Sequence, residues 1–171
     1  MCIEVEIKLR PIIKEDLASL NRWKNDKETF KYLGGGFHPV SIDEQEKWLD
    51  SMIKMTNQNK RYIILADEKP IGMIGLYAIH LINQNCEVGV YIGEKEYRGK
   101  GYAKQAYLLL EDYAKQFLNI RKVKLFVVFE NKHALSYWKK LGFEEVGTLH
   151  QERYIEGEFK DLMIMEKFLC K

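Results

Sequence analysis

A short glycine-rich segment contains the residues whose types and spacing could bind a phosphate group. Two glycines and an alanine allow a tight turn and a close approach of the backbone to a ligand, because no large side chain intervenes. A helix that begins at about Tyr102 would direct its unpaired N–H groups and its dipole at this turn. We therefore predict an anion site for a phosphate or pyrophosphate, with mobile positive charge from Arg98 and Lys100 at its rim. The segment reads Tyr97-Arg98-Gly99-Lys100-Gly101-Tyr102-Ala103.

The spacing excludes two common phosphate loops. A nucleotide triphosphatase loop needs Ser or Thr after Gly-Lys, whereas Gly101 follows Lys100 here. A dinucleotide fingerprint needs a third glycine at the position of Lys104. The pattern Arg98-x-x-Gly101-x-Ala103 resembles the (Gln/Arg)-x-x-Gly-x-(Gly/Ala) signature of the GNAT N-acetyltransferase superfamily, which binds the pyrophosphate of acetyl-coenzyme A. A sharp strand-to-helix turn with solvated charges is the alternative interpretation.

Length and composition indicate one domain and exclude several classes of function. The chain has 171 residues, 30% of them charged, and a net charge of +2. The basic residues are scattered, so they indicate no nucleic-acid partner, and no apolar run approaches membrane-spanning length. Cys2, Cys86 and Cys170 are odd in number and lack metal-ligand spacing. They favour reduced thiols in a cytoplasmic protein, without a metal site and without a membrane partner.

The order of predicted elements is strand, two or three helices, three strands, helix, strand, helix and two strands. Ile3 begins the first strand and Pro11 ends it, and a capping box at Ser41 begins a helix after the triple glycine 34–36. Other helices are expected at 15–24, 30–33, 102–117 and 131–141, and other strands at 61–66, 71–82, 86–92, 122–129, 144–153 and 158–168. We therefore predict a single α+β domain over residues 1–171, with a mixed, mostly antiparallel sheet of about seven strands flanked by helices.

A second motif and the element order also resemble the GNAT superfamily across essentially the whole chain. Asn131-x-x-Ala134, followed by Lys139, Gly142 and Phe143, is similar to the family's Asn-x-x-Ala…Lys-x-Gly-Phe helix and turn. The segment 147–165 resembles the branch typified by ribosomal-protein N-terminal acetyltransferases. That branch also contains polyamine, aminoglycoside and nucleotide-sugar amine acetyltransferases.

The resemblance implies that acetyl-coenzyme A is the co-substrate and assigns residues to its parts. Backbone N–H groups of residues 99–103 would hold the pyrophosphate, and an N–H near Ile92 or Gly93 would face the thioester carbonyl. Asn131 would bind the pantetheine or its neighbouring strand, and Lys139 or Lys140 would reach the adenosine phosphates. The implied cofactor-binding residues are Tyr91, Ile92, Gly93, Arg98, Gly99, Lys100, Gly101, Tyr102, Ala103, Asn131 and Lys139.

Acetyl transfer to an amine needs a proton acceptor for the amine and help for the departing thiolate. An alkylamine has a pKa near 10.4, so making it neutral at pH 7 costs roughly 4–5 kcal/mol. Glu87 is the first candidate for the base, and an ion pair with a nearby Lys or Arg is its alternative role. Trp138 stands where the family pattern often has a tyrosine, so Tyr137 is the candidate acid. Packing of Tyr137 between helix and sheet, with the thiolate leaving directly to solvent, is the alternative.

The resemblance to the GNAT superfamily implies an N-acetyltransferase that acts on a primary amine by direct attack in a ternary complex. The acceptor would be a small amine, an amino sugar or a protein N-terminus. A non-catalytic GNAT-fold module that senses or scaffolds through acyl-coenzyme A is the alternative. A homodimer is also expected, because the apolar last strand at 162–169 could pair or swap between subunits. Acids that could serve a cationic acceptor are Asp26, Glu28, Glu44, Glu152 and Glu156.

Overall fold

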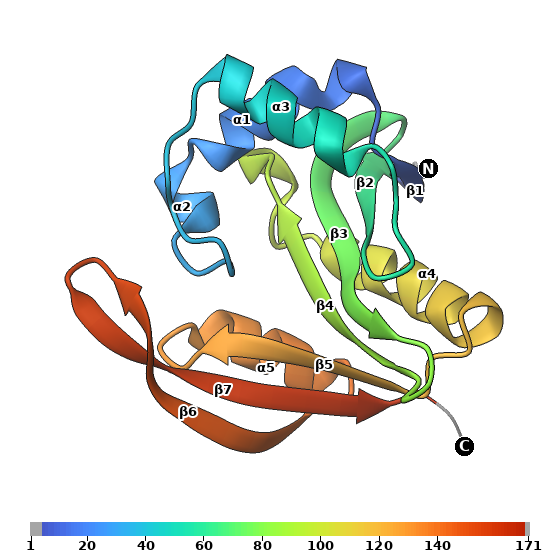
Figure 1. Cartoon of the computed structure of the whole chain (residues 1–171), viewed down its shortest axis with the longest axis vertical. Helices are drawn as coiled ribbons and strands as arrows, with labels where there is room; N and C mark the ends of the chain where they lie inside the picture. Colours follow the sequence, from blue (N-terminus) through green and yellow to red (C-terminus); the bar gives the residue numbers. More distant parts are fainter. Residues whose placement is uncertain (1–4, 170–171) are drawn as a thin grey trace.

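Seven strands form one sheet, and helices cover both of its faces (Figure 1). The structure is a computed structural model that describes residues 5–169. The strand order is β1-β2-β3-β4-β5-β7-β6, and every neighbouring pair is antiparallel except β4 and β5, which are parallel. This arrangement confirms the predicted α+β fold with a mixed, mostly antiparallel sheet.

The predicted element order is confirmed along the chain. The strands are β1 Ile7–Pro11, β2 Lys60–Ala66, β3 Lys69–His80, β4 Asn85–Ile92, β5 Lys122–Val128, β6 Glu144–Ile155 and β7 Glu158–Phe168. The helices are α1 Leu17–Lys24, α2 Lys27–Phe30, α3 Ile42–Met52, α4 Tyr102–Phe117 and α5 Lys132–Lys140, with short 3-10 turns η1 Lys14–Asp16 and η2 Lys95–Tyr97.

Strand alternation divides the apolar side chains between the two faces. Val88 of β4 lies in a core under α4 and α5, together with Leu110. Leu20 and Leu49 of α1 and α3 form a second core on the opposite face, which Tyr91 of β4 joins. The sheet therefore has an α4–α5 face and an α1–α3 face, as the alternation within β4 predicts.

The N-terminal elements differ from the prediction in their bounds. The first strand begins at Ile7, within the segment predicted from Ile3 to Pro11, and residues 5 and 6 are not part of it. Ile3, Cys2 and Cys170 lie outside the described residues. The helix predicted at 30–33 is instead the short α2, which Asp26 caps through its bond from the Thr29 N–H. The chain then turns into the triple glycine, where a helix gains little stability.

The position of β7 contradicts the expectation of an open last strand. β7 pairs through its residues Leu162–Phe168 with the whole of β5 on one side, and it pairs with β6 on the other. The edge strands of the sheet are β1 and β6. Because the backbone hydrogen-bonding groups of the segment Leu162–Phe168 are used within the chain, it cannot add a strand from a second subunit at its edge.

Candidate active site

A V-shaped opening between β4 and β5 is the main feature of the sheet (Figure 1). The two strands pair over only three residues each, ending at Glu87 and Lys124. Beyond this point β4 continues along β3 to Ile92, and β5 continues along β7 to Val128. The β4 edge therefore runs unpaired along the opening, which we call the wedge, with Glu87 and Lys124 at its apex.

Hydrogen-bond alternation decides which peptide groups of β4 face the wedge. The Gly93 N–H donates to the Ile71 carbonyl at 2.8 Å, so this group is used within the sheet. In an antiparallel pair, successive residues alternate between bonding the partner strand and pointing away from it. Val88, Val90 and Ile92 therefore direct their backbone groups toward the wedge. Of the two donors expected to face the thioester, only that of Ile92 points in this direction.

An uncapped helix N-terminus follows the end of β4. The N-cap of α4 is Gly101, with a φ of 82° and no capping side chain. In contrast, α2, α3 and α5 have side-chain caps from Asp26, Ser41 and Asn131. A Cβ built on Gly101 or Gly99 would meet no atom within 4 Å, so the outer surface of this turn is open. The free N–H groups and the helix dipole provide the geometry that an anion site needs.

The Arg98 side chain has a different place from the one predicted. Its Nε donates to the Ile92 carbonyl at 3.0 Å, and its Nη2 donates to the Thr29 hydroxyl at 2.6 Å. Arg98 therefore ties the end of β4 to α2 and is not mobile charge at the rim. Lys100 is exposed and stays at the rim. Because the Arg98 side chain is used in this way, Arg98 would contact the cofactor through its backbone. That contact remains a prediction.

Aromatic side chains fix the end of β4 on the α1–α3 face. The Tyr91 ring packs at 5.1 Å from Phe30 and 6.0 Å from Trp23, measured between ring centroids. Burial raises the pKa of the Tyr91 phenol. A Cβ on Gly93 would lie 2.3 Å from the Trp23 ring, so only glycine fits there. Tyr91 and Gly93 can therefore contact a ligand only through their backbone, or act indirectly by fixing the conformation of the end of β4.

Glu87 lies at the apex of the wedge on the same face as Tyr91. Its side chain is 32% exposed, and a Glu87 oxygen lies 3.8 Å from the Lys124 ammonium. The structure thus contains the ion pair that was the alternative role of Glu87. It also places the carboxylate where the wedge begins, so the role as a base stays a prediction.

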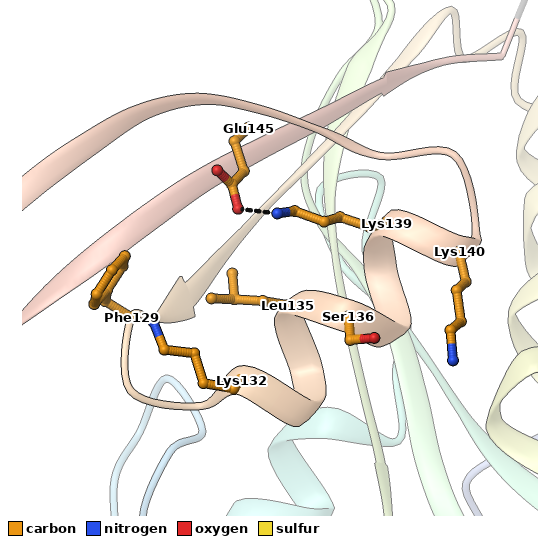
Figure 2. A pocket seen from close by; sticks show the side chains of 7 residues that line it. All are labelled: Phe129, Lys132, Leu135, Ser136, Lys139, Lys140 and Glu145. Carbon is orange, nitrogen blue, oxygen red and sulfur yellow. Dashed lines mark ion pairs between the residues drawn. The ribbon is translucent and has the colours of Figure 1, made fainter.

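Two cofactor candidates lie on α5: Asn131 at its start, and Lys139 on its outer flank, where Figure 2 shows it. The Lys139 ammonium pairs with Glu145 of β6 at 2.8 Å, beside a cavity of about 660 Å³. Lys139 is two residues from Tyr137, about 200° around the helix, so the two side chains lie on different flanks. The Asn131 Oδ1 accepts the Ala134 N–H at 3.2 Å and caps the helix. The cofactor roles of Lys139 and Asn131 remain predictions.

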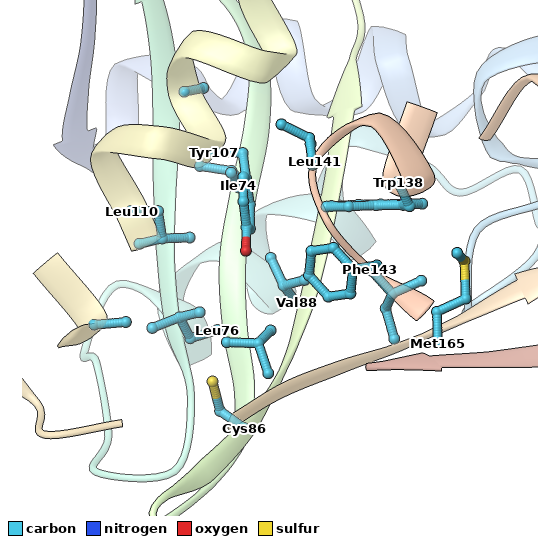
Figure 3. Close-up of a cluster of buried hydrophobic side chains, with 14 of the residues drawn as sticks. Ile74, Leu76, Cys86, Val88, Tyr107, Leu110, Trp138, Leu141, Phe143 and Met165 are labelled. Atoms are coloured by element: carbon cyan, nitrogen blue, oxygen red, sulfur yellow. The ribbon is translucent and has the colours of Figure 1, made fainter. Parts of the chain in front are cut away.

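The inner side of α5 packs against α4 through aromatic rings (Figure 3). Trp138 lies 5.4 Å from the Tyr107 ring and 5.1 Å from Phe143, so it fills the core. Within the described range, the buried hydroxyls of Tyr137 and Tyr107 have no hydrogen-bond partner. Burial raises the pKa of both phenols. Sequence reasoning did not single out Tyr107, because a buried hydroxyl without a partner results from tertiary packing.

The Cys86 thiol is buried in the core on the α4–α5 face. Burial raises the pKa of Cys86 to about 12, so the thiol stays protonated and packs in the core. Among residues 5–169, no group of three or more His, Cys, Asp or Glu side chains could hold a metal ion. No helix in that range is long and apolar enough to cross a membrane.

Comparisons with known proteins agree with this geometry. Spermidine N(1)-acetyltransferase of Escherichia coli (strain K12) is 29% identical over 159 residues, covering 93% of this chain and 84% of that protein. The putative ribosomal N-acetyltransferase YdaF of Bacillus subtilis (strain 168) is 30% identical over 100 residues, covering 58% of this chain and 54% of that protein.

A solved structure and a family model extend the comparison. The crystal structure of spermidine N-acetyltransferase from Vibrio cholerae in complex with CoA and spermine is similar with a TM-score of 0.87 and 27% identity, over 95% of each chain. The model of the acetyltransferase (GNAT) domain matches residues 6–144. The wedge, the uncapped helix and these similarities lead to one conclusion: the chain belongs to the GNAT family and is an acetyl-coenzyme A-dependent N-acetyltransferase.

Proposed function

We propose that this enzyme acetylates the primary amine of a small molecule by direct attack on acetyl-coenzyme A in a ternary complex. The wedge between β4 and β5, with the uncapped α4 N-terminus after it, is the observation on which the proposal depends. The relatives from E. coli and V. cholerae are named spermidine acetyltransferases, which supports a small amine over a protein N-terminus. Their catalytic names also favour an enzyme over a non-catalytic sensor.

The cofactor would lie along the open edge of β4. Its pyrophosphate would accept hydrogen bonds from the N–H groups of residues 99–103, where the helix dipole favours negative charge. Its pantetheine arm would enter the wedge and bond the Ile92 N–H and the outward peptide groups of Val90 as an added strand would, while the Ile92 carbonyl accepts from Arg98. The missing strand pairing on this edge supports that placement.

The thioester belongs closer to the apex than the resemblance alone implied. Glu87 and Ile92 are five residues apart, which is about 17 Å along an extended strand. A base at Glu87 cannot reach an amine that attacks a thioester beside Ile92. We therefore place the carbonyl beside the N–H of Val88 or Val90. One preorganised N–H at the developing oxyanion typically contributes about 3–4 kcal/mol.

Glu87 would accept the proton of the amine, and Tyr137 would stabilise the departing thiolate. The Glu87 carboxylate takes the proton of the acceptor ammonium, directly or through water. The Lys124 ammonium lies 3.8 Å from this carboxylate. The raised pKa keeps the Tyr137 phenol protonated. A thiol has a pKa of about 8.5, which is below that of the Tyr137 phenol. Tyr137 therefore donates a hydrogen bond to the departing thiolate and keeps its proton.

An amine panel tests the proposal directly. Purified protein with acetyl-coenzyme A should release free coenzyme A thiol when the correct amine is added, and mass spectrometry should show the acetylated product. Tight coenzyme A binding without turnover on any amine would instead establish the sensor.

A homodimer and a cytoplasmic location remain proposals. A dimer would have to use the edge strands β1 or β6 or a helix face, because β7 is paired on both sides. A concentration-independent monomer in light scattering would exclude it. The free, buried thiol of Cys86 agrees with a reducing compartment, which fractionation of the source cells would test.

A further inference from the structure

A cavity of about 500 Å³ lies between α2, the loop with the triple glycine, and the tip of the β6–β7 hairpin. This volume is in the range that holds a small ligand. The charged residues of its lining are Lys27, Lys31, Arg153 and Glu156, together with His38. Cations therefore outnumber carboxylates around this cavity.

The cavity borders the mouth of the wedge on the α1–α3 face. Phe30 of α2 packs against Tyr91 at the end of β4. Two residues later, Tyr32 packs with Val128 of β5 and Leu162 of β7. The segment 29–32 thus reaches from one arm of the wedge to the other, and Lys27 and Lys31 of the same segment line the cavity. A molecule whose amine enters the wedge on this face extends toward the cavity.

Arg153 is the best-placed cation in the cavity. Its side chain is half-buried, and its Nη1 donates to the Tyr32 carbonyl at 2.9 Å. Desolvation lowers the pKa of the guanidinium. Within residues 5–169, no carboxylate lies within ion-pair distance of Arg153. A partly buried cation without a carboxylate is costly, and an anionic ligand would offset that cost.

Two lysines add unpaired positive charge around the same loop. The Lys31 ammonium lies 4.7 Å from the centre of the Tyr32 ring, and no described carboxylate pairs with it. The Lys24 ammonium donates to the Gly36 carbonyl at 3.1 Å, and burial lowers its pKa. Only Lys27 has a carboxylate partner in the lining, namely Glu156.

Three of the five carboxylates that were expected to receive a cationic acceptor are already paired, whereas Glu44 and Glu152 are exposed and have no ion-pair partner among the described residues. Asp26 and Glu28 both lie within ion-pair distance of Lys95, at 3.2 Å and 2.9 Å. Glu156 is held by Lys27. A polyamine reaching this cavity would therefore meet cations, whereas a carboxylate or phosphate would meet a planar guanidinium that suits it.

We propose that the cavity binds a carboxylate or phosphate carried by the acceptor, held by Arg153 and Lys31, so that the substrate is an amine with an anionic end. This inference rests on the proposed acetyl transfer, because the cavity takes the far end of the acceptor. Under this proposal the acceptor differs from the polycation spermidine, for which the relatives are named.

Matched acceptors provide the test. Aminoalkyl phosphates, the aminoalkanols of equal chain length and the corresponding diamines are compared by kcat/KM. The phosphates should exceed the alkanols by about tenfold or more, as charge-assisted hydrogen bonds predict. R153Q and K31Q should each remove most of this preference by lowering kcat/KM for the phosphates. K47Q, which changes the same charge on an exposed site of α3, should retain it.

Three results would overturn the inference: equal kcat/KM within each pair, faster acetylation of the diamines, or a preference that survives both R153Q and K31Q. Calorimetry with inorganic phosphate on coenzyme A-saturated protein separates this failure from failure of acetyl transfer. Binding lost in R153Q but kept in K47Q supports the anion site even if no amine is acetylated. If inorganic phosphate binds at Arg153 but does not compete with an aminoalkyl phosphate, the site binds a free anion. That result would overturn the proposal that the cavity holds the anionic end of the acceptor.

Discussion

Tyr137 and Tyr107 place two buried hydroxyls in the same interior, between α4 and α5, without partners in the described chain. An unpaired buried hydroxyl costs free energy, so each one calls for an explanation. A hydrogen bond that forms only when the thiolate departs would explain Tyr137. Tyr107 packs among Trp138 and Phe143 and provides a comparison from the same core.

We expect Tyr137→Phe to lower kcat by about tenfold to a hundredfold, because a hydrogen bond to a charged group is lost. Its melting temperature should stay equal or rise, because the hydroxyl has no partner in the free enzyme. Tyr107→Phe should keep kcat. Steady-state rates and thermal unfolding check both variants, and an equal loss of kcat in the two would assign Tyr137 to packing.

Glu87→Gln should reduce kcat by a hundredfold or more, as loss of a general base typically does, and change the KM for acetyl-coenzyme A little. Lys124→Met removes the partner at 3.8 Å but keeps the carboxylate, so its effect on kcat should be much smaller. If the two variants lose activity equally, the activity depends on the Glu87–Lys124 ion pair, and the role of Glu87 is structural.

At the scale of elements, the phosphate turn was predictable and the wedge was not. Gly99 and Gly101 have φ values of 71° and 82°. This left-handed conformation favours glycine, so the two glycines in the sequence predict it. The wedge depends on how many residues of β4 pair with β5, and the paired residues, such as Asn85 and Lys122, are 37 positions apart in the chain. The engagement of Arg98 with Thr29 is also long-range, so the sequence motif could not reveal it.

Gly101→Ala tests the turn against a control with the same backbone. Gly101 and Gly157 have φ values of 82° and 90°, and a Cβ on either would meet no atom within 4 Å. Each alanine should therefore destabilise the fold similarly, by about 1–2 kcal/mol. Only Gly101→Ala should weaken coenzyme A binding, by about tenfold or more in calorimetry. Equal affinity in the two variants would contradict the phosphate-turn role.

For the whole molecule, buried acidic groups set the response to alkaline pH. Burial raises the pKa of Cys86 from its usual 9.0 to about 12, and that of Tyr62 from 10.0 to about 12. Between these values the unfolded chain loses the proton and the folded chain keeps it. Stability is therefore fully present below about pH 9 and falls as pH rises toward 12.

We expect the free energy of unfolding to fall from pH 9 to 11, with Cys86 contributing up to about 1.4 kcal/mol per pH unit. Urea titrations at several pH values measure this slope. Cys86→Ala will lower stability at every pH because it leaves a cavity, but it should flatten the slope. A slope that is unchanged by the substitution would contradict the assignment to Cys86.

The internal position of β7 also bears on how the chain is made. β5, the far arm of the wedge, is held by β4 over three residues and by β7 along its full length. A nascent chain on the ribosome would thus present its phosphate turn and β4 early, while β5 still lacked its main support. The binding cleft would become complete only after the ribosome has released Phe168, so coenzyme A would not assist the earlier stages of folding.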